Sequence, residues 1–114
     1  MTAERGKIDK DQDLQLASAL KLTNSDNWIK VRNGIGVLGK FPEEEQALKM
    51  LTTLAADVEE LDCLRTAAIK SLYNFDQPEL IDFYEKIVNN PHENKSFIQQ
   101  AENNLNNLSK RIKK

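Results

Sequence analysis

The stretch LDCLRTAAIKSLYNF, residues 61–75, indicates the fold of the whole chain. Its small and apolar residues recur at helical spacing and would form one face of a helix: Leu64, Ala67, Ala68, Ser71, Leu72 and Phe75. The small residues on that face would let a neighbouring helix approach closely. The stretch therefore predicts an amphipathic helix that packs against similar helices on either side.

The strongest evidence for this is an apolar pattern that returns after about 33 residues, a period typical of arrays of helical hairpins. The segment after Pro42 carries the series Ala47, Leu48, Leu51, Leu54 and Ala55. The segment after Pro78 carries the equivalent series Leu80, Ile81, Tyr84, Ile87 and Val88. Proline is tolerated in the first turn of a helix, so both segments have a helix start at the same place.

The helix at 61–75 has counterparts in both directions. Downstream, its apolar positions map at the same offset onto Phe97, Ala101, Leu105 and Leu108. Upstream, at an offset that is one residue longer, they map onto Ile35, Leu38 and Phe41. This longer offset also places Leu14, Ala17 and Leu20 on the inner face of a first helix, together with Leu16. The chain is therefore expected to hold six helices.

The length of 114 residues suits one domain with three hairpins. The expected helices cover residues 10–21, 27–39, 43–56, 61–75, 77–88 and 93–110, which gives repeats at 10–41, 42–75 and 76–110. Residues 1–9 lack apolar periodicity and are expected to be flexible, and residues 111–114 form a basic tail. The outer face of the last helix is expected to be polar, as in a capping repeat: Gln99, Gln100, Asn103, Asn104, Asn106 and Asn107.

Composition and single residues limit the classes of function. The net charge is −2, and basic and acidic residues are balanced between the two halves of the chain, which argues against a general nucleic-acid binder. The lone Cys63 cannot form an internal disulfide, and no signal peptide or membrane-spanning run is evident, so a cytoplasmic protein is expected. Cys63 is expected to be buried or inert and His92 to lie in a turn. We therefore expect no catalytic residue, no metal site and no cofactor.

Two glycines, Gly34 and Gly36, lie inside the helix expected at 27–39. Glycine within a helix costs about 1 kcal/mol relative to alanine. Gly34 occupies a position where the next copy has alanine, so close helix packing is the expected explanation, with a functional hinge as the alternative.

Two segments, LRTAAIKSLYNF (64–75) and VRNGIGVLGKF (31–41), resemble the second helix of HEAT-like repeats. The resemblance covers about residues 10–110 and implies an all-α, right-handed α-solenoid of about three HEAT-like hairpins. It also implies a ladder of ion pairs inside the repeats, in which Arg32 pairs with Asp26 and Arg65 with Glu59.

The resemblance implies a protein–protein interaction or assembly module, a scaffold or adaptor without catalysis. HEAT-like arrays usually bind partners through the surface of their second helices, which here comprises Lys30, Asn33, Val37, Arg65, Lys70, Tyr73, Gln100 and Asn103. Basic and amide groups of this kind suit an acidic, hydrogen-bonding protein partner. Two alternatives stay open: nucleic-acid binding through the same basic residues and the tail, and a chromophore-handling protein similar to the phycobilin lyases. No membrane contact is expected, and the sequence leaves the oligomeric state open.

Overall fold

The computed structural model describes residues 2–112, with side chains from residue 12 onward. This part of the chain is all-helical, as predicted, and contains six α-helices. They are α1 (Thr2–Thr23), α2 (Trp28–Leu38), α3 (Glu45–Ala56), α4 (Asp62–Ser71), α5 (Glu79–Val88) and α6 (Lys95–Ile112). A short 3-10 turn, η1 (Leu72–Asn74), continues α4.

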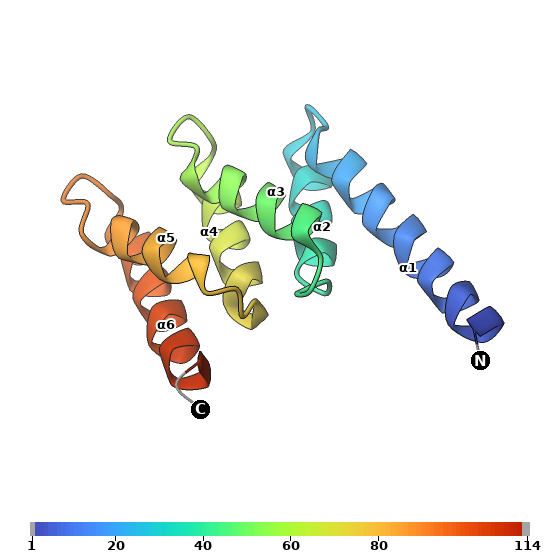
Figure 1. The fold of residues 1–114 in the computed structure, drawn as a ribbon. Helices are drawn as coiled ribbons and strands as arrows, with labels where there is room; N and C mark the ends of the chain where they lie inside the picture. Colours follow the sequence, from blue (N-terminus) through green and yellow to red (C-terminus); the bar gives the residue numbers. More distant parts are fainter. Residues whose placement is uncertain (1, 113–114) are drawn as a thin grey trace.

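Consecutive helices pack as pairs, α1 with α2, α3 with α4 and α5 with α6, and the three pairs lie in a row (Figure 1). Helix α4 contacts both α2 and α6, so these three helices lie side by side and join the pairs. The Cα atoms occupy a flat volume of 50 × 41 × 15 Å. None of the described helices combines the length and the apolar character that a membrane span requires.

Every helix except α1 begins within two residues of its predicted start, and α3 and α5 end at the predicted residues. Helix α1 begins at Thr2, well before the predicted start at residue 10, so helical backbone already covers most of the segment 1–9. Residue 1 and the side chains of residues 2–11 lie outside the described part. Helix α6 ends at Ile112 and includes Arg111, so the predicted tail 111–114 begins inside a helix. Lys113 and Lys114 are outside the described residues.

The two equivalent apolar series of the second and third repeats form the middle of the core. All five members of the first series are buried in α3. In the second series Leu80, Tyr84 and Ile87 are buried, while Ile81 and Val88 are half-buried against the same core. Full burial of one such aliphatic side chain stabilises the fold by about 1.5–3 kcal/mol. Because the apolar stripes of α3 and α5 face neighbouring helices, this stabilisation is lost if those helices separate.

Helix α1 packs through only part of the stripe predicted. Leu16 is buried and Leu20 is half-buried against the core, as predicted, but Leu14 is 67% exposed and Ala17 is exposed, and Ala19 is buried in their place. The segment LQLASAL (14–20) contains two overlapping apolar stripes, and the mapping onto the later helices assigned Leu14 and Ala17 to the wrong side. The buried stripe is the one that meets α2.

Two buried polar groups join the second and third helix pairs. The Asn104 amide donates hydrogen bonds to the carbonyl oxygen of Ile69 (2.7 Å) and to the hydroxyl of Tyr84 (3.3 Å). The Tyr84 hydroxyl donates in turn to the carbonyl oxygen of Leu72 (3.3 Å), and burial raises the pKa of Tyr84 to about 12. The prediction that Asn104 lies on the polar outer face is therefore wrong. Carbonyl groups at the end of α4 need donors, and Asn104 supplies one.

The two glycines of α2 lie in opposite environments. A Cβ atom added to Gly34 would lie 2.7 Å from the carbonyl oxygen of Ala19 and 2.9 Å from Cβ of Leu22, both on α1. A Cβ atom added to Gly36 would meet nothing within 4 Å. The prediction of close helix packing is confirmed for Gly34 and is wrong for Gly36.

We predict opposite effects of alanine at these two positions. Gly34→Ala should lower the free energy of unfolding by about 1–2 kcal/mol, because a backbone oxygen cannot move aside without separating α1 from α2. Gly36→Ala should raise it by about 0.5–1 kcal/mol, because alanine removes backbone entropy from the unfolded chain at no steric cost. Urea unfolding of both variants checks this, and equal effects would contradict the packing described here.

Candidate functional site on helices α2, α4 and α6

The three helices that join the pairs have an excess of basic over acidic residues. Helices α2, α4 and α6 together carry seven basic and two acidic residues. The first helices of the pairs, α1, α3 and α5, together carry six basic and eight acidic residues. The charge asymmetry therefore lies between the first and second helices of the pairs, although the two halves of the sequence are balanced.

Most of the predicted partner-binding residues are available on this surface. Five of them are exposed: Lys30, Asn33, Lys70, Tyr73 and Asn103. Tyr73 is 44% exposed and belongs to η1. Gln100 is half-buried, and its amide donates to Asn104 Oδ1 (3.0 Å). The exposed set combines cationic and amide groups with one aromatic ring.

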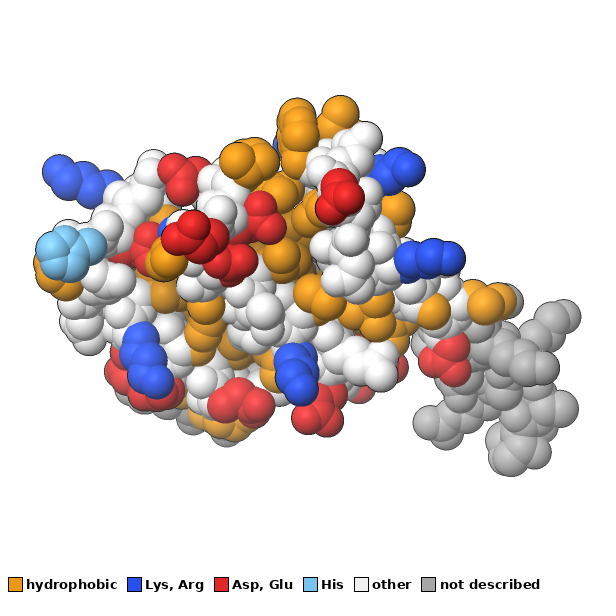
Figure 2. Space-filling view, turned by 90° about the horizontal axis from the view of Figure 1, so that it is seen from above, with side chains coloured by type: hydrophobic (Ala, Val, Ile, Leu, Met, Phe, Trp, Pro, Cys, Tyr) orange, Lys and Arg blue, Asp and Glu red, His pale blue; other side chains and the backbone are white. Residues whose placement is uncertain are grey.

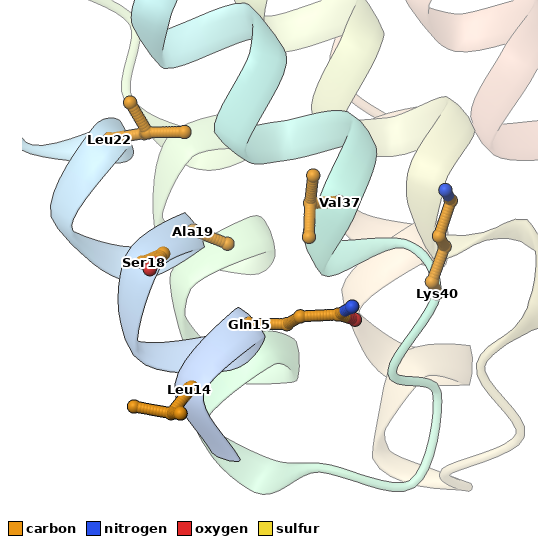
Figure 3. Close-up of a pocket in the computed structure, with 7 residues that line it drawn as sticks. All are labelled: Leu14, Gln15, Ser18, Ala19, Leu22, Val37 and Lys40. Atoms are coloured by element: carbon orange, nitrogen blue, oxygen red, sulfur yellow. The ribbon is translucent and has the colours of Figure 1, made fainter. Parts of the chain in front are cut away.

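Val37 belongs to a different part of the surface. It is half-buried and lines a hollow of about 380 Å³ between α1 and the end of α2, shown in Figure 3. Gln15 reaches from α1 toward Lys40 across this hollow, and Ser18 and Ala19 line it from the next turn of α1. The structure therefore separates Val37 from the α4 residues with which it was grouped.

Arg65 is buried and is not part of the exposed surface. Its Nη1 and Nη2 atoms donate to the two carboxylate oxygens of Glu93 at 2.9 and 2.8 Å, and the two side chains are 7% and 9% exposed. Its Nε atom donates to the carbonyl oxygen of Ala55 (3.0 Å), and its guanidinium lies 4.5 Å from the ring centre of Phe97. The prediction that Arg65 binds a partner is therefore wrong.

The predicted ion-pair ladder also differs from the structure. Arg65 pairs with Glu93, in the turn between α5 and α6, instead of with Glu59. Among the described side chains, no ion pair joins Arg32 to Asp26. The hydrogen bonds from Arg65 lower the pKa of Glu93, and those same bonds raise the pKa of Arg65. The pair thus links one helix pair to the next and does not close a turn within a repeat.

Arg32 was predicted to belong to the ion-pair ladder and was not among the residues predicted to bind a partner. Arg32 is exposed and lines a groove of about 450 Å³ between α2 and α4. Lys70, Thr66 and Cys63 line the same groove from α4. Cys63 is exposed, so the expectation that it is buried is wrong. One sequence signal could have distinguished Arg32 from Arg65. Arg65 packs on the ring of Phe97, whereas the residue equivalent to Phe97 near Arg32 is Leu64, which has no ring.

The turns between paired helices give this surface an acidic edge. Figure 2 looks onto these turns and shows acidic and hydrophobic side chains gathered near the centre of the view. The turn between α3 and α4 supplies exposed Asp57 and Glu59, half-buried Glu60, and Val58 and Leu61, which are 71% and 51% exposed. Like charge would keep an acidic partner away from this edge. Lys70 is in the last turn of α4, at the end of the helix away from this acidic turn, so repulsion of an acidic partner is weakest there.

In the described part of the chain, no three His, Cys, Asp or Glu side chains are grouped as metal ligands would be. A scan against models of protein families matches none of them. Searches of curated proteins and of solved structures find no significant match. The geometry and charge of the surface are therefore the features from which a function can be inferred.

We predict that the ion pair between Arg65 and Glu93 stabilises the fold at neutral pH. Glu93→Gln should lower the free energy of unfolding by about 3 kcal/mol, because it leaves a buried guanidinium without its counter-charge. The pKa of Glu93 is lowered in the folded state. The contribution is therefore fully present above the ordinary glutamate pKa of about 4.3 and is lost as the pH falls through the lower folded-state pKa.

The pair between Arg111 and Asp76 provides a matched control. Its atoms are 2.7 Å apart, but the side chains are 34% and 67% exposed. Asp76→Asn should therefore change the free energy of unfolding by only about 0.5 kcal/mol at neutral pH. Urea unfolding at neutral and acidic pH measures both variants. Equal losses, or a Glu93→Gln effect that grows in acid, would contradict the assignment.

Proposed function

We propose that this chain is a right-handed α-solenoid of three HEAT-like hairpins that acts as a non-catalytic protein-interaction module. Three helix pairs in a row, each in contact with the next, are the arrangement expected of such an array. Repeat arrays of this kind present one layer of helices as an extended binding surface. In this chain that layer is α2, α4 and α6.

The observation that carries the proposal is the difference in charge between the two layers. The exposed basic residues of α2 and α4, Lys30, Arg32 and Lys70, lie on the layer that also presents exposed amides such as Asn33. Complementary charge increases the rate of encounter and the specificity of a protein complex. The expected partner is therefore a protein with an acidic, hydrogen-bonding surface.

Nucleic-acid binding is a second candidate, because the same layer carries six basic residues besides the buried Arg65. A polyanion would have to follow the basic residues along the array and pass the acidic edge at Asp57 and Glu59. Phosphate contacts also make affinity fall steeply with salt concentration. The two candidates therefore differ in the retained partner and in its response to salt.

We predict that charge reversal on α2 and α4 abolishes partner binding. Extract from the native source is passed over the immobilised protein, and bound proteins and nucleic acids are both identified. The variant Lys30→Glu/Lys70→Glu should lose a protein that the wild type retains. The matched control Lys49→Glu/Lys86→Glu makes the same change of net charge on α3 and α5 and should keep that protein.

Two outcomes would contradict the proposal. Equal loss in both variants would mean that net charge, and not the α2–α4 surface, controls retention. Recovery of nucleic acid that moderate salt removes would support the second candidate in its place. Circular dichroism spectra and melting curves verify that both variants are folded.

A further inference from the structure

Arg32 and Arg65 occupy equivalent positions in successive repeats, and the structure places them in different states. They are one repeat period apart, each on the second helix of a pair. Arg65 is buried at the junction of α4 and α6. Arg32 is exposed at the junction of α2 and α4, where it lines an open groove of about 450 Å³. At the second junction, α4–α6, the arginine is paired with a carboxylate. At the first junction, α2–α4, the equivalent arginine lines an open groove.

Side-chain size explains why one junction is filled and the other open. At the α4–α6 junction, Arg65 packs against the ring of Phe97. The residue equivalent to Phe97 at the α2–α4 junction is Leu64, which offers no aromatic face. The groove is lined on α4 by Thr66 and Ala67, whose equivalents on α6 are the longer Gln99 and Gln100.

Among the described residues, the first junction also lacks a carboxylate that pairs with Arg32 as Glu93 pairs with Arg65. Glu60 has the same place in the sequence relative to Arg32 as Glu93 has relative to Arg65. The Glu60 Oε1 atom accepts a hydrogen bond from the backbone N–H of Leu61 (2.9 Å), as Glu93 Oε1 does from Asn94 (3.3 Å), but Glu60 forms no ion pair with Arg32. Among the side chains of residues 12–112, none forms an ion pair with Arg32.

We propose that the groove between α2 and α4 binds an aspartate or glutamate side chain from an acidic segment of a partner protein. The inference rests on the proposed function and names the chemistry of its contact. Arg32 would hold the carboxylate through two parallel hydrogen bonds, as Arg65 holds Glu93. Lys70, which lines the same groove, supplies a second positive charge.

The groove favours a single carboxylate over a continuous polyanion. Asp62 also lines it, so two cations face one fixed carboxylate. Asp57 and Glu59 lie on the adjoining turn and would repel further negative charge. One inserted carboxylate satisfies Arg32, whereas a chain of phosphates would also have to approach the acidic edge.

The test is a fluorescence-anisotropy titration of the whole chain with a labelled short peptide that alternates Glu and Ser. Arg32→Gln should weaken binding at least about tenfold, because it removes a bidentate charge-assisted contact. Thr66→Gln/Ala67→Gln should weaken it comparably, because the groove is filled as at the α4–α6 junction while both cations remain. Lys86→Gln removes a positive charge on α5 and should leave binding unchanged.

Four results would overturn the inference. One is a wild type that does not bind the peptide. Another is equal weakening in Lys86→Gln, and the third is full binding by the variant with the filled groove. An oligothymidylate that binds as tightly as the peptide, with the same response to the variants, would assign the groove to phosphate. The proposed function fails separately, in the retention experiment: through equal loss in both charge-reversal variants or through recovery of nucleic acid in place of a protein.

Discussion

The contacts of the Arg65 guanidinium group are the interaction on which the arrangement of the helix pairs depends most. From α4 it contacts the last turn of α3 through Ala55, the turn before α6 through Glu93, and α6 itself through Phe97. Buried charges are tolerated only when they are paired and hydrogen-bonded, and these contacts meet that condition. Because the contacts come from two different helix pairs, they fix the third pair relative to the second. Asn104 and Tyr84 strengthen the same junction.

The two helices of the first pair are held together by a different contact. Gly34 lets α1 approach α2 so closely that a single methyl group would collide with the carbonyl oxygen of Ala19. Helix α4 then packs on α2, and the groove lined by Arg32 and Lys70 stays open. The second and third pairs are thus joined by a polar junction, whereas the two helices of the first pair are held by close packing. The open groove lies on the layer with the excess of basic residues.

The helical pattern of the sequence was sufficient to predict the all-α class, the six helices and the buried series of α3 and α5. It failed at Leu14 and Ala17 of α1, which were predicted to face inward and are exposed, whereas Ala19 is buried. It failed at Arg65 because the carboxylate partner comes from the next repeat and not from the neighbouring turn. Exposed positions such as Lys30, Asn33 and Lys70 were predicted well, because nothing in the core competes for them.

The measurement that tests this account most directly is the solvent exchange of arginine Nε–H protons by NMR on the wild-type protein. The Arg65 Nε–H group is buried and donates to Ala55, so its exchange should be strongly slowed at neutral pH. The Arg32 Nε–H group is on an exposed side chain and should exchange rapidly. Equal exchange rates at the two sites would contradict the distinction between a structural arginine and an available one.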